Sequence, residues 1–446
     1  MVTLANVNIW NRKAGIVMWD EQKQSAVFEY DADFERAGLD LAPLQMPVSV
    51  HQAYSFQSLS YETFMGLPGL LADALPDAYG KALLDRWLAT VGRTFANPVE
   101  RLCYQGKRSM GALEFEPAQD SFLEHEARIE IDALVQVARE ALLQKEQLNV
   151  NLSDDRKEAL LNIIKVGTSA GGQRAKAVIA YNGQTGEVRS GQVDAPKGFQ
   201  HWLLKLDGIT NLEIGRPEGA TLAVQELGVP KHYGRIEYAY YLMAREAGIE
   251  MMPSRLLEEN GRAHFMTRRF DRTESNGKLH MQTLCGLAHY DYKLLRAYSY
   301  EQAFQVMRRL RLPYQQAEEM FRRMVFNVVA RNQDDHTKNI SFLMNHEGTW
   351  RLSPAYDVSW AYNPEGEWTA QHQMSINGKY TDITRADLLA VASNMNIKRP
   401  REIIEKVINA VANWPKWAKE VGIPADITRA IASTHLLHLA QPIDNL

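Results

Sequence analysis

A polar loop, a short hairpin and a second polar loop follow one another in the last third of the chain. The loop NQDDHTKN contains Asp334 and, five positions later (339 − 334), Asn339. Asp357 comes 23 positions after Asp334 (357 − 334). Between them, the apolar stretches at 340–344 and 349–353 flank a turn ending in glycine, a pattern that predicts two paired strands.

The residue types in these loops suit phosphoryl transfer. A carboxylate at Asp334 can accept the proton of an attacking hydroxyl group. Asn339 and Asp357 offer hard oxygen ligands for magnesium, and Lys338 offers a point charge near the transferred phosphate. Protein kinases place their catalytic base and two metal ligands in the same order. Alternatively, the segment is an ordinary capped loop, because Asp and Asn are common turn formers.

A helix is predicted directly before this loop. Its apolar residues recur at spacings of three and four, which is typical of a helix with one buried face. They are Phe321, Met324, Val325, Val328 and Val329. A packed helix would hold the polar loop that follows it in a fixed position.

A glycine-rich segment, GTSAGGQRAK, spans Gly167–Lys176. Backbone N–H groups near Gly171 and Gly172 could bind phosphate oxygens, since glycine lets the backbone approach closely. The segment matches neither the Walker A motif nor the kinase G-x-G-x-x-G pattern. Without further context it could equally be a tight turn.

Three strands are predicted after this segment, at 177–181, 187–193 and 201–208. Lys205 interrupts the apolar run of the third strand, so its charge needs an anion or a route to solvent. We expect Lys205 to hold the α- and β-phosphates of ATP.

A helix is predicted over Arg235–Gly248, ending at a glycine. Glu237 in its first turn is either the ion-pair partner of Lys205 or a charge that is favourable at a helix N-terminus. The dipeptide Asn260-Gly261 then predicts a hairpin. The segment Met266–Phe270 after it is where a kinase hinge would meet adenine, which makes Arg268 and Phe270 candidate nucleotide contacts.

Taken together, these motifs resemble the HipA family of bacterial serine/threonine kinases, the toxins of type II toxin–antitoxin pairs. The resemblance is carried by the glycine-rich loop, the lysine strand, TRRFDR, DDHTKN and SPAYD, in that order. It extends to the N-terminal third through VNIWNRKAG, FEYDADFERAGLDLAPLQMP, GLPGLLADALPDAYGKALLDRWL and MGALEFEP.

The resemblance implies roles for individual residues. It assigns the catalytic base to Asp334, the magnesium ligands to Asn339 and Asp357, and the ATP-binding lysine to Lys205. It places the hinge around Arg268–Phe270. One departure is that Val358 and Ser359 follow the metal-binding aspartate where many kinases have Phe-Gly.

The resemblance also implies regulation and partners. Ser169, with Thr168 beside it, aligns with a serine of the loop that is autophosphorylated in the family, and the added charge would repel the ATP phosphates. The implied activity is inhibition of growth by phosphorylation of a translation component, such as the glutamate-specific aminoacyl-tRNA synthetase. The implied partner is a small helix-turn-helix antitoxin, through which the chain would reach DNA indirectly.

Composition agrees with a cytoplasmic globular protein. The net charge of −4 does not suit a chain that coats nucleic acid. Cys103 and Cys285 show no metal-binding spacing and are expected to be free thiols in a reducing compartment. We recognise no signal peptide and no apolar run long enough for a membrane span.

The expected fold is α+β: a bilobal, protein-kinase-like fold with an extra N-terminal α/β subdomain and a mostly helical C-lobe. The predicted domains are residues 1–118, 119–267 and 268–446. Within the first, residues 69–89 are expected to be helical. Further helices are expected at 129–144, from Ser299 to Leu310 behind a capping box, and at 385–394, 400–412 and 425–439.

Three other functions remain open. A small-molecule kinase would share every ATP-site residue but would have no need for the N-terminal subdomain. A pseudokinase could act only by binding an antitoxin, although the complete set of polar site residues disfavours this. A metal-dependent hydrolase could use Asp334, Asp335 and His336, but three adjacent residues rarely converge on one ion.

Overall fold

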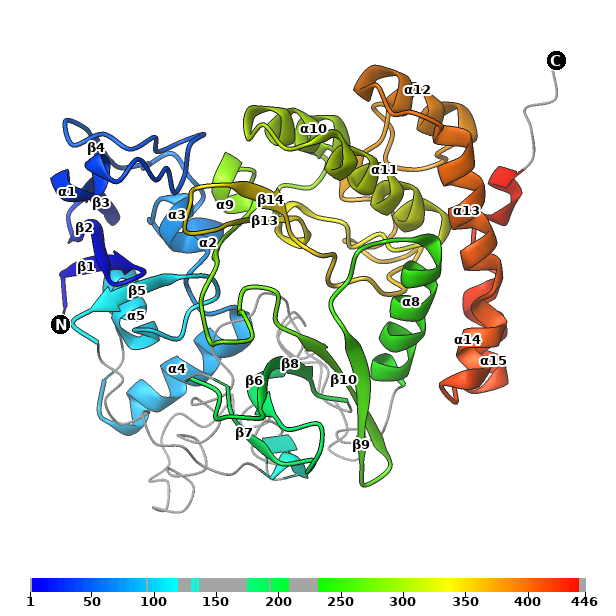
Figure 1. Ribbon diagram of the computed structural model, residues 1–446, viewed down its shortest axis with the longest axis horizontal. Helices are drawn as coiled ribbons and strands as arrows, with labels where there is room; N and C mark the ends of the chain where they lie inside the picture. Colours follow the sequence, from blue (N-terminus) through cyan, green and yellow to red (C-terminus); the bar gives the residue numbers. More distant parts are fainter. Residues whose placement is uncertain are drawn as a thin grey trace.

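The computed structural model describes residues 2–93, 95–118, 130–132, 134–135, 175–191, 194–207 and 232–440. Within these ranges the chain forms two five-stranded sheets and a largely helical third part (Figure 1). Helices and sheets are both present, so the expected mixed α+β class is confirmed. The three predicted domain limits remain a prediction.

Residues 2–118 contain an antiparallel sheet in the order β4-β3-β2-β1-β5. Its strands alternate between buried and exposed residues, and Val7, Val17 and Phe28 are fully buried. The strands are β1 (Leu4–Ile9), β2 (Arg12–Asp20), β3 (Ser25–Tyr30), β4 (Ala53–Tyr54) and β5 (Leu113–Glu116). Helices α1 (Ala32–Arg36), α2 (Tyr61–Phe64), α3 (Gly69–Ala72), α4 (Ala78–Thr90) and α5 (Pro98–Gln105) accompany it.

The helical segment expected over residues 69–89 is in fact two helices, so that prediction is wrong in one respect. Helix α3 ends at Ala72 and α4 begins at Ala78. Pro76 lies between them and cannot donate a helical hydrogen bond. Asp77 caps α4, because its carboxylate accepts a hydrogen bond from the backbone N–H of Gly80 at 2.7 Å.

The second sheet is also antiparallel, in the order β7-β6-β8-β10-β9. Its strands are β6 (Lys176–Tyr181), β7 (Val188–Ser190), β8 (Gln200–Lys205), β9 (Ser254–Glu259) and β10 (Arg262–Arg268). The three strands predicted before residue 208 are therefore present, with shorter limits for β7 and β8. The α8 helix (Tyr233–Ala247) packs on β10 and ends at Gly248, which has a positive φ of 88°.

The predicted hairpin between the two polar loops is also present. Strands β13 (Ser341–Met344) and β14 (Trp350–Leu352) pair antiparallel, and β11 (His280–Thr283) lies on the other side of β13. The helix expected before the loop is α11 (Tyr314–Val329), whose predicted apolar residues are all buried. A small parallel pair joins β12 (Tyr298–Ser299) to β15 (Met374–Ser375).

The remaining helices are α9 (Leu284–Ala288), α10 (Tyr300–Arg309), α12 (Arg385–Met395), α13 (Pro400–Ala412), α14 (Trp414–Glu420) and α15 (Ala425–Ala432), with the short 3-10 helices η5 (Thr337–Asn339) and η6 (Leu437–Ala440). Helices α12 to α15 form the right-hand part of Figure 1, while α9 lies near α3 on the other side of the molecule's centre. The capping box predicted at Ser299 is present. The last expected helix is interrupted, because the Leu436 N–H turns to donate to Val329 O of α11 at 2.9 Å.

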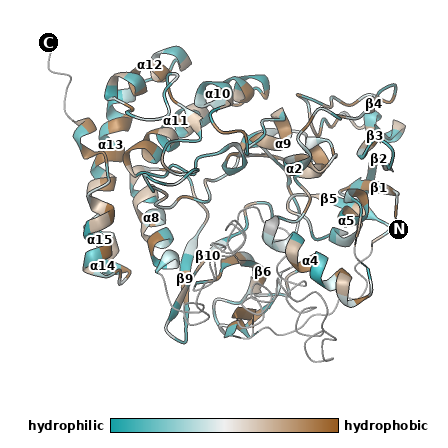
Figure 2. Ribbon diagram, turned by 180° about the vertical axis from the view of Figure 1, so that it is seen from behind, coloured by the Kyte–Doolittle hydropathy of each residue, from teal (hydrophilic) through white to brown (hydrophobic). Residues whose placement is uncertain are grey.

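Viewed from behind, the helices carry both hydrophobic and hydrophilic residues, as expected for helices with one buried side (Figure 2). Their buried residues form one continuous core from α8 to η6. Among the helices in the described ranges, none has the length and apolar character to cross a lipid bilayer.

Candidate active site

Lys205 lies at the end of β8 between two carboxylates. Its Nζ donates to Glu237 Oε1 of α8 at 2.5 Å and also to Asp357 Oδ1. Lys205 and Glu237 are almost fully buried. A buried ion pair of this kind requires close opposite charges to offset the loss of hydration. The predicted contact between the strand lysine and the helical glutamate is therefore present.

Asp357 is held in an unusual backbone conformation. Its φ of 54° lies in the left-handed region, which residues other than glycine seldom adopt. The segment before it is anchored on both sides: the Ala355 N–H donates to Glu250 O at 2.8 Å, and the Tyr356 hydroxyl donates to Lys338 O at 2.6 Å. These contacts maintain a conformation that would cost on the order of 1–3 kcal/mol by itself.

The carboxylate of Asp357 is ionised at neutral pH. Burial by itself would raise its pKa, but the charges of Lys205 and Lys176 outweigh that effect and hold the pKa well below its usual range. The His336 ring acts in the same direction. About a quarter of the side chain remains exposed, so a ligand can reach it.

Asp334 projects from the polar loop, with about half of its side chain exposed. Its backbone carbonyl accepts a hydrogen bond from Asn339 Nδ2 at 2.7 Å, which closes the loop over η5. His336 Nε2 lies 3.8 Å from Asp334 Oδ1. His336 also lowers the pKa of Asp357, so this one ring interacts with the carboxylates that precede and follow the hairpin.

The neighbouring Asp335 points the other way, into the protein. Its buried carboxylate accepts hydrogen bonds from the Tyr300 hydroxyl and the Gln373 N–H, each at 2.8 Å, and lies 2.8 Å from His372 Nδ1. Asp335 therefore braces the loop and cannot share an ion with Asp334. Within the described ranges no cluster of three His, Cys, Asp or Glu residues could hold a metal, so the hydrolase hypothesis loses its ligand set.

Lys338 lies beside the ring of Tyr292, with its Nζ 4.8 Å from the ring centroid. Burial acts to lower its pKa, but Cys285, Tyr292 and Asp73 together raise it above the ordinary value. Lys338 is therefore charged at neutral pH and can attract a phosphate group.

The donor set matches magnesium chemistry. Asp357 provides carboxylate oxygens, and the hydrogen bond from Asn339 Nδ2 orients the amide so that its Oδ1 is left for a ligand. Magnesium prefers such hard oxygen donors and commonly takes only one or two of them from the protein.

The predicted hinge has a less open structure than expected. The backbone N–H groups of Arg268 and Arg269 donate to Pro253 O and His201 O, each at 2.9 Å, so neither can serve a bound base. The Arg268 side chain pairs with Glu274. Phe270 packs against the ring of Tyr356 with centroids 5.5 Å apart, which connects it to the Asp357 segment.

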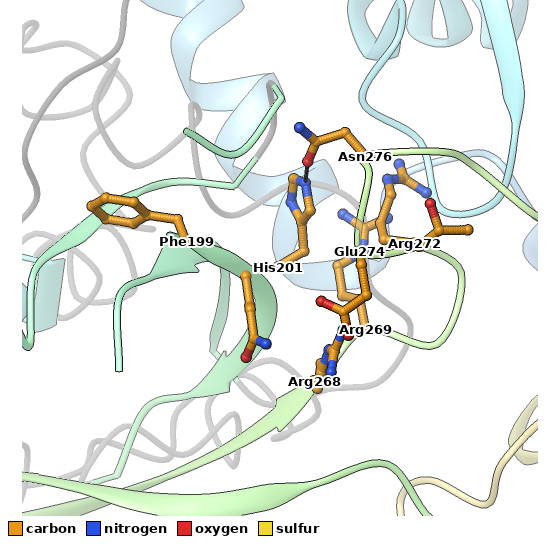
Figure 3. A pocket seen from close by; sticks show the side chains of 9 residues that line it. Phe199, His201, Arg268, Arg269, Arg272, Glu274 and Asn276 are labelled. Atoms are coloured by element: carbon orange, nitrogen blue, oxygen red, sulfur yellow. Dashed lines mark hydrogen bonds and ion pairs between the residues drawn. The ribbon is translucent and has the colours of Figure 1, made fainter. Parts of the chain in front are cut away.

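A small pocket lies where β8 meets the loop after β10 (Figure 3). Arg268, Arg269, His201 and Asn276 are among its lining residues. Most of its lining side chains are polar or charged.

Several predictions lie outside the described residues. They concern the glycine-rich segment before Lys176, with Gly171 and Gly172, and the proposed phosphorylation sites Thr168 and Ser169. Most of the helix expected over 129–144 is also outside them.

The structure also brings in residues that the sequence reasoning missed. Lys176 is paired in register with Lys205, and its Nζ lies 3.4 Å from Asp77 Oδ2. Asp73 accepts hydrogen bonds from Thr283 at the start of α9. Burial raises the pKa of Asp73 to about 6, although the Lys338 charge opposes the shift. The Pro76-Asp77 pair was a readable signal of a helix break, but not of these contacts.

Comparison with known protein families gives two matches that together span most of the chain. The HipA N-terminal domain matches residues 5–116, and the HipA-like C-terminal domain matches residues 168–415. A comparison with curated protein sequences gave no match.

Solved structures that match the chain include the following two. The Shewanella oneidensis MR-1 toxin–antitoxin system HipA, described in complex with HipB and its operator DNA, is similar at 17% sequence identity. The match has a TM-score of 0.66 and covers 98% of this chain and 96% of that one, which shows a shared fold. The Helicobacter pylori proinflammatory kinase CtkA has a TM-score of 0.32 and 12% identity, and covers 54% of this chain and 89% of its own. The family matches and the shared fold lead to one conclusion: this chain belongs to the HipA family.

Proposed function

We propose that the protein is an ATP- and magnesium-dependent serine/threonine protein kinase that acts as the toxin of a toxin–antitoxin pair. The observation that carries this proposal is the contact of Lys205 with both Glu237 and Asp357. That contact joins the second sheet to the loop after β14. The loop before β13, on the other strand of the same hairpin, contains Asp334 and Asn339. Family membership and the mixed α/β fold agree with it.

In the proposed reaction, the hydroxyl oxygen of the substrate bonds to the γ-phosphorus of ATP while Asp334 accepts the proton of that hydroxyl group. The bond between the γ-phosphorus and the oxygen that bridges it to the β-phosphorus breaks, and ADP leaves with the electron pair of that bond. Lys205 binds the α- and β-phosphates, and Lys338 stabilises charge on the transferred group. Asn339 and Asp357 would hold magnesium, which would offset the negative charge of the triphosphate.

The exposure of Asp334 favours a protein substrate. With about half of its side chain exposed, it can meet a hydroxyl on the surface of another folded protein. A translation component, such as the glutamate-specific aminoacyl-tRNA synthetase, is the class of target that the family resemblance suggests. The same resemblance suggests that Ser169 or Thr168 is autophosphorylated, which would weaken ATP binding through charge repulsion.

A helix-turn-helix antitoxin is the proposed partner. The similar Shewanella structure is described as a complex of HipA, HipB and operator DNA. This chain has a net charge of −4, so DNA contacts would come from the partner. Both proteins would act in the cytoplasm.

The test is incubation of the full chain with magnesium and γ-labelled ATP, with the target synthetase present or absent, followed by peptide mass mapping. The Asp334→Ala variant should lose label incorporation by about 10²–10⁴-fold, the usual contribution of a general base. The matched control is Asp33→Ala, because Asp33 is an exposed carboxylate of α1 that lies in another part of the fold.

Equal labelling by wild type and Asp334→Ala would remove Asp334 as the base. Absence of label together with absence of ATP binding by the unphosphorylated wild type would instead favour a binding-only role toward the antitoxin.

A further inference from the structure

We propose that the turn between α3 and α4 forms part of the phosphate-binding site. In this arrangement Asp77 is a positioning residue that acts through Lys176, and Asp73 anchors the turn on the C-terminal part of the protein. The inference deepens the proposed function and rests on it, since it assigns residues 2–118 a share in the ATP site.

The first step is the local structure of the turn. Helix α3 ends at Ala72, Pro76 prevents its continuation, and Asp77 caps the next helix. The break therefore places Asp73 and Asp77 on one short turn instead of on a continuous helix. Both carboxylates contact residues from later in the chain: Asp73 contacts Thr283, and Asp77 contacts Lys176.

The second step is the docking of the turn. Asp73 accepts hydrogen bonds from the Thr283 N–H at 2.7 Å and the Thr283 hydroxyl at 2.8 Å. Glycines make this approach possible: a Cβ at Gly286 would lie 2.1 Å from Asp73 Oδ2, and a Cβ at Gly69 would lie 2.0 Å from Gly286 O. Helices α3 and α9 are thus in backbone contact, so the position of the turn is closely determined.

The third step is the lysine pair in the second sheet. Lys176 of β6 and Lys205 of β8 are directly opposite residues in an antiparallel pair. Such neighbours project to the same side of the sheet, and like charges in this position destabilise it. Glu237 provides a counter-charge for Lys205 from within the same sheet-and-helix unit.

Asp77 provides a counter-charge for Lys176 from the N-terminal region. Lys176 Nζ lies 3.4 Å from Asp77 Oδ2, and both side chains are less than 5% exposed. The ion pair fixes the Lys176 ammonium on the side of the sheet where Lys205 lies opposite it. A carboxylate of the N-terminal region therefore fixes the lysine that lies opposite the proposed ATP-binding lysine, Lys205.

This arrangement predicts that removing one partner does more harm than removing both. In Asp77→Asn, a buried ammonium remains beside Lys205 with less compensation, so Lys205 should be displaced from the phosphates. In the double variant Asp77→Asn/Lys176→Met, the extra positive charge is gone as well, and replacing a buried ion pair in full is often well tolerated.

The experiment is calorimetric titration of the full chain with Mg-ATP, which does not depend on phosphoryl transfer. Asp77→Asn should bind Mg-ATP about tenfold more weakly than wild type, and the double variant should recover at least half of that loss on a logarithmic scale. The matched control is Glu100→Gln, because this buried carboxylate of the same region pairs with Arg93, another residue of that region. It should lower Tm but leave Mg-ATP affinity unchanged.

Three results would overturn the inference: unchanged or tighter binding in Asp77→Asn, a double variant no better than the single one, or an equal loss in Glu100→Gln. If Asp77→Asn does not fold, a folded double variant with near-wild-type affinity supports the pairing, and an unfolded one contradicts it. Failure of the wild type to bind Mg-ATP would instead contradict the proposed function itself.

Discussion

The two five-stranded sheets of this protein have similar architecture but different interiors. Both are antiparallel, and both place a hairpin beside longer connections. In the N-terminal sheet the fully buried residues of the described strands are apolar, with the exception of Ser25. In the second sheet Lys176, Lys205, His201 and His264 are also buried. The sheets therefore share strand number and antiparallel pairing but differ in strand order, and they differ most in the buried lysines of the second sheet.

The difference shows why one sheet is a candidate site and the other a structural element. Burying a charge costs free energy unless a partner is placed close to it. In the second sheet the partners come from outside the sheet: Glu237 from α8, Asp357 from the loop after β14, and Asp77 from the α3–α4 turn. A sheet that requires partners from three separate segments will be sensitive to the loss of any one of them.

The largest effect should come from the charged sheet. Lys205→Met removes the cation between Glu237 and Asp357 and should reduce phosphoryl transfer by about 10²–10³-fold, as for the loss of one group that stabilises transition-state charge. Mg-ATP titration and label incorporation measure it. In the N-terminal sheet Lys13→Met is the matched control, because Lys13 is 40% exposed and pairs only loosely with Asp31 at 3.7 Å. Equal losses in both variants would erase the distinction between the sheets.

The apolar sheet should instead respond through stability. Phe28 of β3 is fully buried, and Phe28→Ala should lower the free energy of unfolding by about 3–5 kcal/mol through lost burial and a residual cavity. Urea unfolding measures this loss. At a temperature where the variant remains folded, its Mg-ATP affinity should equal that of the wild type. A large loss of affinity in the folded variant would show that this sheet also shapes the ATP site.

A smaller effect is expected where the two halves of the molecule meet. The Nε2–H of His280 in β11 donates to Leu41 O at 2.9 Å, while its Nδ1 is buried without a hydrogen-bond partner. Burial lowers the pKa of His280 to about 4. In the unfolded chain the His280 imidazole binds a proton below its ordinary pKa of 6.5, whereas in the folded protein it does so only near pH 4. The contribution of the neutral, buried imidazole to the free energy of unfolding is therefore complete above pH 6.5 and is lost as the pH falls toward 4.

At pH 5 that contribution should have decreased by about 2 kcal/mol, since each unit of pKa difference corresponds to about 1.4 kcal/mol. Comparison of urea unfolding at pH 7.5 and 5 should show a shallower pH dependence for His280→Gln than for the wild type. Because His201, His289 and His435 titrate in both proteins, only the difference between the two slopes reports on His280. Identical slopes would contradict the assignment.

Local patterns predicted much of the secondary structure. The capping box at Ser299, the helix ending at Gly248 and the hairpin between the polar loops all depend on residues close together in sequence, and all three are present. Errors arose where a distant contact decided the outcome. The last helix is interrupted because Leu436 bonds to Val329, which is far from it in the sequence.

The candidate site likewise has features that local sequence predicts and features that depend on distant contacts. The order of Asp334, Asn339 and Asp357 around a hairpin, and a charged Lys205 in an apolar strand, are visible in the sequence because spacing and residue type express them. The opposite directions of Asp334 and Asp335 are not visible, since Tyr300 and His372 reach Asp335 from other elements.

The family and the mixed fold class could therefore be inferred from the sequence, and so could the residue types of the candidate site. The tertiary structure alone decided that Asp73 and Asp77, more than a hundred positions before the polar loops, meet Thr283 and Lys176. The physical reason is that periodicity and capping act over a few residues, whereas the pairing of buried charges depends on which segments packing brings together.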